Sequence, residues 1–402
     1  MLIGYNQICI NPTKPTIHVG IFNEKNPILN VRGDLYARCL RLKSDDHNLI
    51  ILAFDSLGIS KDIQRIFESK IKEVIKEDVT FIFSSTHTHY APSLCNVNNL
   101  INVDQTYMEY TVKKVALMIK NCHLVDKNIY VNYSWEQFDH VGKPRINNKS
   151  SDQVYGGVLS FYDDHARIGN IVFYNCHPTT PQGYANYFTS EFPGSAVERL
   201  IRKYPKEFFI YLQGADGDIS TRLNRRSNNY DEITRLGNLL ALHFIKLMNR
   251  NANLKQRILT IDHVQEQFDV NVQLKPYKEI LSDKLDQYTE KELIELSFGE
   301  KFVNVMKDKI IDTQTSVTFN CLDLAGYRLI FNPFELFSDY NRYINKDQTL
   351  LVCYSQGLIG YLTQPKNKHI SYEYYIELQT EEDKQNVISK IKAYNQKSFF
   401  TK

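Results

Sequence analysis

Short apolar runs alternate with amphipathic segments along most of this chain. Runs of about 4–8 apolar residues, rich in branched and aromatic side chains, are typical of buried strands. Such runs lie at Leu49–Phe54, Val79–Ser85, Ile171–Tyr174 and Phe208–Leu212. Segments with apolar residues spaced as on one face of a helix lie at Ile63–Ile75, Tyr107–Ile119, Gly194–Lys203 and Ile233–Met248. Strands that alternate with helices predict an α/β fold in which layered mixed sheets are flanked by helices.

The last third of the chain combines a polar stretch with two further strand-like runs. Residues 264–312 are more polar than their surroundings, contain a helical pattern at Tyr288–Lys309, and are a candidate for a peripheral insertion. Strands are expected at Tyr327–Phe331 and Leu350–Tyr354. No internal repeat, low-complexity tract or Pro/Gly/Ser-rich linker interrupts the sequence, so we expect residues 1–402 to form a single domain.

Composition and charge argue against several classes of protein. Charged residues make up 23% and hydrophobic residues 43% of the chain, as in an ordinary globular protein. The formal net charge of +2 gives no electrostatic basis for binding nucleic acid or a membrane surface. No apolar stretch approaches the length of a membrane span, and Met1–Tyr5 lacks the features of a signal peptide.

Cysteine usage indicates a reducing compartment. The chain has seven cysteines, an odd number, widely scattered and without a CxxC pair. A disulfide framework is therefore not expected, and the cytoplasm is the simplest location.

Polar residues follow directly after four of the strand-like runs. Asp55 follows the first run, His87 and His89 follow the second, His177 the third, and the turn Gly214–Ser220 the fourth. In open α/β sheets, ligands bind beyond the carboxyl ends of the strands. We therefore expect these four strand ends to form one shared site.

Two histidines in "STHTHYAP" provide the first indication of the chemistry. In extended chain, His87 and His89 point to the same face, because they are two residues apart. With His177 they could hold Zn²⁺, which imidazole suits. The alternative is that they are ordinary polar residues at a turn, and the absence of an HExxH motif means that spacing alone does not decide. The turn "QGADGDISTR" presents Asp216, Asp218 and Ser220, or is simply an acidic β-turn.

Several short motifs together resemble the neutral (non-lysosomal) ceramidase family. They are, in chain order, "VRGDLYARCLRL", "LIILAFDSLG", "STHTHYAP", "NCHPTT", "SEFPGSAVERL", "QGADGDIS" and "GLIGYLT…YEY". Their order and approximate spacing match that family over about residues 1–375. The resemblance implies a ceramidase-like catalytic domain. The family's ceramidases also have a sandwich-like (Ig-like) C-terminal domain. We do not expect that domain here, because only a short segment follows Tyr374.

The resemblance also implies a zinc site. His87, His177 and Tyr361 match the family's zinc ligands. The family's ligand glutamate has no clear counterpart, because aligning "NPFE" through its Pro-Phe pair puts Asn332 at that position. Glu335, three residues later, could serve only if the local backbone shifts register. Both residues are kept as candidates.

Four further residues match family positions that contact the substrate. His89 would lie beside the metal and contact the reacting group, and Tyr372 would sit over the substrate. Ser220 would engage the amide, and Arg145 in "GKPRINN" would bind the polar part of the substrate. The implied reaction is amide hydrolysis by a zinc-activated water, with Tyr372 or His89 stabilising the oxyanion or protonating the leaving amine.

The expected function is therefore a zinc-dependent amidase or deacylase. A cytoplasmic location and the missing second domain favour a small polar or acylated metabolite over ceramide. One alternative is a metal-free member of the same fold that binds a ligand or a protein partner, which Asn332 favours. A third hypothesis is hydrolysis of an ester or another acyl group. The sequence leaves the oligomeric state open.

Overall fold

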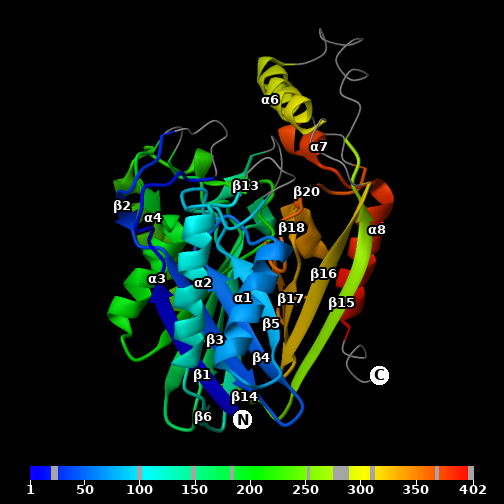
Figure 1. Cartoon of the computed structure of the whole chain (residues 1–402). Coiled ribbons are helices and arrows are strands. Elements are labelled where there is room, and N and C mark those ends of the chain that lie inside the picture. Colours follow the sequence, from blue (N-terminus) through cyan, green and yellow to red (C-terminus); the bar gives the residue numbers. More distant parts are fainter. Residues whose placement is uncertain are drawn as a thin grey trace.

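The computed structural model describes residues 1–19, 26–96, 102–145, 151–181, 185–250, 254–274, 289–307, 313–366 and 371–396 (Figure 1). Three sheets form its frame. The first contains, in spatial order, β5 (Thr80–Ser85), β4 (Asn48–Phe54), β3 (Tyr36–Lys43), β1 (Leu2–Cys9) and β6 (Val125–Asp126). The second contains β12 (Phe208–Gln213), β10 (Arg167–Tyr174), β9 (Tyr155–Tyr162), β7 (Tyr130–Gln137) and β14 (Gln256–Arg257). The third contains β15 (Ile261–Asn271), β16 (Gln314–Leu324), β17 (Tyr327–Phe331) and β19 (Thr349–Val352).

Helices and short strands complete the architecture. The helices are α1 (Lys61–Val74), α2 (Gln105–Lys120), α3 (Glu191–Lys203), α4 (Tyr230–Met248), α6 (Glu290–Met306), α7 (Tyr372–Ile376) and α8 (Glu381–Tyr394), with 3₁₀ turns η1 (Ser151–Gln153), η2 (Thr221–Leu223) and η4 (Ser338–Tyr343). Three two-stranded pairs join β2 (Val31–Gly33) to β11 (Phe188–Thr189), β8 (Lys143–Pro144) to β13 (Ile219–Ser220), and β18 (Phe334–Leu336) to β20 (Gly360–Leu362). β13, β18 and β20 lie toward one end of the large sheets, and β20 contacts α7 (Figure 1).

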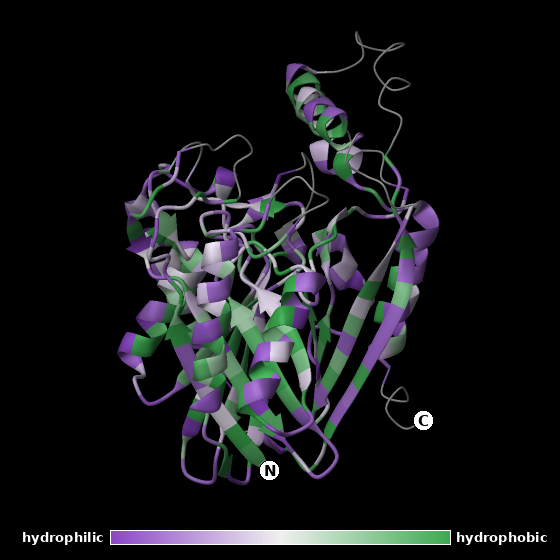
Figure 2. Cartoon of the chain, viewed as in Figure 1, coloured by the Kyte–Doolittle hydropathy of each residue, from purple (hydrophilic) through white to green (hydrophobic). Residues whose placement is uncertain are grey.

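The inner strands of the large sheets are largely buried on both faces. In β4, Leu49, Ile51 and Ala53 face a central core that all three sheets share. Ile50, Leu52 and Phe54 point the other way, to a core that contains α1 and α2. The outer face of the second sheet is covered in the same way by α3 and α4, and that of the third sheet by α8. Double burial explains why these strands read as continuous apolar runs, which appear as green strands in Figure 2.

Parallel pairing brings strand ends together. β4 pairs with β5, β10 with β12, and β17 with β19 in parallel, whereas the other pairs within the three sheets are antiparallel. Paired parallel strands end at the same edge of a sheet, so the loops that follow them can meet. The mixed α/β class with layered sheets and flanking helices, predicted from the sequence, is confirmed.

The sequence pattern misses β1, β7 and β9, and also the first two strands of the third sheet. Residues 264–271, assigned above to the candidate insertion, lie in β15, which pairs with β16 along its whole length. β15 is an edge strand with mostly half-buried or exposed residues, so its sequence is polar and lacks an apolar run. The described helix of this segment is α6, which packs on α7 through Leu296 and Tyr375.

Two further findings concern the sequence predictions. Among the residues that the structure describes, no helix is both long enough and apolar enough to cross a membrane. All seven cysteines are free.

Two leucines on α4 test the layered packing. Leu240 is fully buried between α4 and the second sheet, whereas Leu242 is 52% exposed. Leu240→Ala should lower the free energy of unfolding by about 2–5 kcal/mol, because it leaves a cavity. Leu242→Ala, with the same change in helix propensity, should cost about 0.5 kcal/mol or less. Chemical denaturation of both variants measures this, and equal effects would contradict the packing.

Candidate functional site

Two of the loops at the strand ends carry three histidines that converge. His87 and His89 follow β5, and His177 follows β10. One potential ligand atom from each of the three lies within 4.8 Å of those from the other two. His87 and His177 are buried, and their ring centroids are 4.9 Å apart. The structure thus brings together the histidines that the strand-end pattern singled out.

Hydrogen bonds to backbone carbonyls fix the orientation of two of the rings. Nδ1 of His87 lies 2.8 Å from the carbonyl oxygen of Leu57, and Nδ1 of His177 lies 2.9 Å from that of Asp216. A carbonyl oxygen only accepts, so each Nδ1 must carry the hydrogen. In the neutral ring, each Nε2 then presents a lone pair, the arrangement found in metal-ligating histidines.

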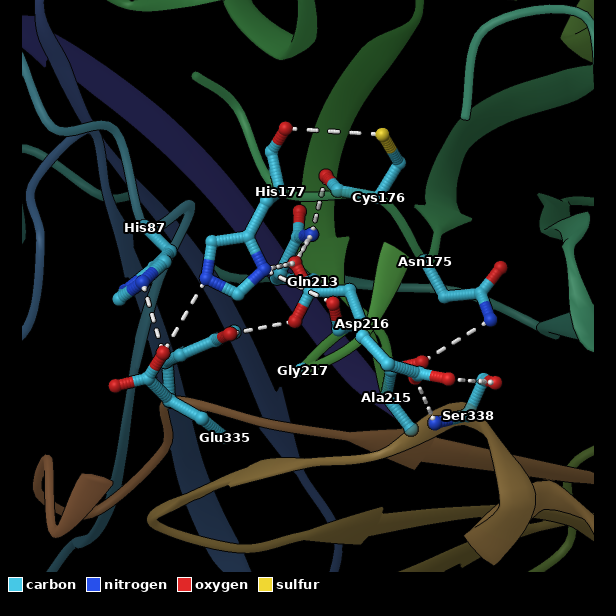
Figure 3. A network of polar contacts seen from close by, with 12 residues as sticks. His87, Asn175, Cys176, His177, Gln213, Ala215, Asp216, Gly217, Glu335 and Ser338 are labelled. Atoms are coloured by element: carbon cyan, nitrogen blue, oxygen red, sulfur yellow. Dashed lines mark hydrogen bonds and ion pairs between the residues drawn. The ribbon is translucent and has the colours of Figure 1, made fainter. Parts of the chain in front are cut away.

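Glu335 faces these two lone pairs. Its Oε2 lies 3.2 Å from Nε2 of His177 and 3.5 Å from Nε2 of His87 (Figure 3). Burial raises the pKa of Glu335, but the two imidazoles outweigh burial and hold it well below its usual range. Burial lowers the pKa of His177, and the carboxylates of Asp216 and Glu335 reverse that effect.

Strand pairing explains why Glu335 and Tyr361 reach the same place. They are register partners in the parallel pair β18–β20, so their side chains lie on the same face. Phe334 and Leu336, on the opposite face of β18, pack into the core under α8. Oη of Tyr361 lies 3.5 Å from Nε2 of His177.

Asn332 has a different environment. Its Nδ2 donates to the carbonyl of Val352 at 2.9 Å, and its Oδ1 accepts from the backbone N–H of Phe334 at 3.1 Å. The side chain therefore closes the turn between β17 and β18. Of the two candidates from the sequence, the structure places Glu335 next to the histidines, because the alternation of β18 turns it away from the core.

The acidic turn after β12 supports both His177 and Glu335. The Asp216 carboxylate lies 3.3 Å from Nδ1 of His177 and accepts from Oη of Tyr354. Gly217 donates its N–H to the carbonyl of Leu336 at 2.8 Å. A Cβ at Gly217 would lie 2.6 Å from the carbonyl oxygen of Glu335, so this close approach requires glycine.

Tyr354 is a site residue that the sequence analysis missed. Its ring stacks on His87 with centroids 3.8 Å apart. Tyr354, Gln356 and His87 all have positive φ angles, of 52°, 60° and 63°. Backbone strain of this kind clusters at functional sites, where the surrounding contacts hold it in place. The sequence contains a signal for Tyr354, because it lies at the end of a strand-like run, and the other site residues lie just after such runs.

Arg145, Tyr372 and Ser220 lie around this cluster. Oη of Tyr372 is 3.0 Å from Oη of Tyr361, and burial raises the pKa of Tyr372 well above its usual value. Arg145 forms an ion pair of 2.5 Å with Glu373, and its guanidinium lies 5.6 Å from the centroid of the Tyr372 ring. Ser220 forms a β-bridge with His177 and accepts, through Oγ, the N–H of Arg222 at 3.4 Å.

Gly217→Ala tests the contact between the acidic turn and β18. The new methyl group meets backbone atoms of Glu335 and Leu336, so β18 must shift. We expect a loss of about 1–3 kcal/mol in the free energy of unfolding, as for other overpacked sites. Ser220→Ala, which adds no atom to the same turn, should cost about 1 kcal/mol or less. A denaturation midpoint equal to that of the wild type for Gly217→Ala would contradict the described contact.

Comparison with known proteins supports the fold of this site. No family model matches the sequence, and no curated protein sequence matches it. Solved structures similar to this chain include a ceramidase complexed with C2 (TM-score 0.72, 12% identity) and the neutral ceramidase from Pseudomonas aeruginosa (TM-score 0.73, 13% identity). Each alignment covers 98% of this chain and 74% of the ceramidase chain. The chain therefore has a ceramidase-like fold.

Proposed function

We propose that this protein is a zinc-dependent hydrolase that cleaves an amide C–N bond in a small polar or acylated metabolite. The observation that carries the proposal is the convergence, in a buried place, of two imidazole Nε2 atoms and a carboxylate oxygen. Three acceptor atoms meet here: Nε2 of His87, Nε2 of His177 and Oε2 of Glu335. Acceptors this close repel one another unless a proton or a cation lies between them.

The separations fit ligands that share one zinc ion. Atoms bonded to the same zinc at about 2.0–2.2 Å lie no more than about 4.4 Å apart, and a catalytic zinc would keep a further position for water. The distances from Nε2 of His177 to Oε2 of Glu335 and to Oη of Tyr361 are 3.2 Å and 3.5 Å. The distance from Nε2 of His87 to Oε2 of Glu335 is 3.5 Å. We propose these four residues as the ligands.

The outer contacts of the proposed ligands also fit a metal. Metal-ligating histidines donate the other ring N–H to a carbonyl or a carboxylate, as His87 does to Leu57 and His177 to Asp216. Among the residues that the structure describes, buried Nε2 of His87 has no hydrogen bond, and its charged neighbour is Oε2 of Glu335 at 3.5 Å. A cation that displaces the protons shared with Glu335 would satisfy this atom.

A zinc ion bound here supplies a Lewis acid and lowers the pKa of a water molecule to about 7. Around it, His89 is only half-buried and lies edge-on to His87, with ring centroids 4.9 Å apart. We assign it the transfer of a proton from the attacking water to the leaving nitrogen. Tyr372, kept protonated by burial, donates to the oxyanion that develops on the substrate carbonyl. Water adds to the carbonyl carbon, the C–N bond breaks, and a carboxylate and an amine leave.

Two further side chains complete the proposed site. Arg145 is paired with Glu373, which neutralises its charge, and its guanidinium lies over the ring of Tyr372. It is the residue that we propose to bind the polar part of the substrate. Ser220 is adjacent to His177 and is assigned to the amide group of the substrate, not to nucleophilic attack.

The metal-free alternative loses the feature that favoured it. That hypothesis rested on Asn332 in place of a ligand glutamate, and Glu335 lies beside the histidines instead. Ester hydrolysis uses the same attack on a carbonyl, and a matched pair of amide and ester substrates distinguishes the two reactions.

Zinc content tests the ligand assignment. Protein purified without added metal should contain about one equivalent of zinc by elemental analysis, and His87→Ala and His177→Ala should contain none. Glu335→Gln should bind zinc much more weakly because an amide oxygen is a poorer ligand than a carboxylate. Asn332→Ala is the matched control and should retain zinc. A wild type without zinc that gains none on addition would favour the metal-free binding protein.

Turnover tests the roles of His89 and Tyr372. His89→Ala and Tyr372→Phe should each lower kcat for a short N-acyl amide by about 10²–10³-fold while the zinc content stays at one equivalent. Ceramide and a matched ester are the comparison substrates. Full turnover in both variants, or hydrolysis of the ester alone, would contradict the proposed reaction.

A further inference from the structure

The two loops that carry the histidines meet at the start of α3. This place belongs to the motif "SEFPG", which the proposed chemistry does not use. Thr189, the last residue of β11, holds the first loop: its N–H donates to the carbonyl of Tyr90 at 3.0 Å, and its own carbonyl accepts from Oγ1 of Thr88 at 2.8 Å. Thr88 and Tyr90 flank His89 in the chain, so the contacts fix that loop from both sides of the histidine.

The carboxylate of Glu191 holds the second loop. Its Oε1 accepts the N–H of Thr180 at 2.5 Å, three residues after His177. Arg225 reinforces the same loop, because its Nη1 donates to the carbonyls of Thr179 and Thr180, each at 3.1 Å. Glu191 is also tied to the first loop, because its N–H donates to Oγ1 of Thr189 at 3.1 Å.

The conformation of Glu191 is unfavourable for a residue at the start of a helix. Its φ angle is 60°, in the left-handed region that non-glycine residues rarely adopt. Its side chain is buried, with 1% of the residue exposed, and burial raises its pKa to about 7 although the N–H groups of Phe192 and Thr180 pull the pKa down. Strain and a buried carboxylate at one position persist only where the surrounding contacts hold them.

We propose that Glu191 is a positioning residue that fixes the loop of His177 relative to the loop of His87 and His89. The inference rests on the proposed function, since the spacing that it maintains is the spacing of zinc ligands. The carboxylate has two acceptor oxygens, and it uses one for the loop of His177 and the other for Phe192 of α3. An amide at this position offers one acceptor and turns an NH₂ group toward a backbone N–H.

Chelator competition with zinc alone, on the full chain, tests the proposal. Glu191→Gln should weaken zinc binding by about 10–100-fold, as the loss of an outer contact to a metal site does. Arg225→Gln, which removes two further hydrogen bonds to the same loop, should also weaken zinc binding. The control is Glu198→Gln. Glu198 is an exposed residue of the same helix that forms an ion pair with Arg202, and its variant should bind zinc as the wild type does.

Melting of the metal-free proteins separates positioning from loss of fold. We expect Glu191→Gln to be folded without metal and still to bind zinc weakly. If that variant does not fold, Arg225→Gln alone decides, because Arg225 is only half-buried. Folded variants with the zinc affinity of the wild type would overturn this inference alone. A wild type that binds no zinc would overturn the proposed function and this inference with it.

Discussion

The hydrogen bonds from two imidazole Nδ1 atoms to backbone carbonyls determine what this site can do. They orient the rings of His87 and His177 so that both Nε2 atoms point at the carboxylate of Glu335. Because each Nδ1 donates to a carbonyl oxygen, which cannot donate in return, Nε2 of each neutral ring presents a lone pair to Glu335. The buried cluster is therefore suited to a cation, and every role that we propose for neighbouring side chains follows from that.

The layered fold supplies the places from which these groups project. Strands buried on both faces form a rigid frame, and the loops at the ends of its parallel pairs carry His87, His177 and the acidic turn. Glu335 and Tyr361 come from the short strand pair β18–β20. This pair approaches the acidic turn so closely that only a glycine fits at position 217. Sites built on rigid elements with supporting contacts keep their geometry, whereas isolated loops do not.

The apolar pattern predicted the strands of the three parallel pairs and helices α1, α2, α3 and α4, because these elements carry strong periodic patterns. It did not predict β1, β7, β9, β15, β16 or α8. β17 has the predicted bounds, and β4 and α1 differ from theirs by only a few residues. β15 was missed because half-buried edge strands lack an apolar run. The strand-end pattern predicted that the three histidines lie close together. It did not identify Tyr354, which was interpreted as the end of a strand. The choice between Asn332 and Glu335 depended on the two-residue turn between β17 and β18. No periodic pattern describes such a turn, and only the pairing of β18 with β20 defines where each side chain points.

The most direct test of the account is a crystal structure with anomalous diffraction measured on both sides of the zinc absorption edge. We predict a single strong zinc peak among Nε2 of His87, Nε2 of His177, Oε2 of Glu335 and Oη of Tyr361, about 2.0–2.2 Å from each. A peak elsewhere in the molecule, or zinc-soaked crystals with no peak between these four atoms, would contradict it.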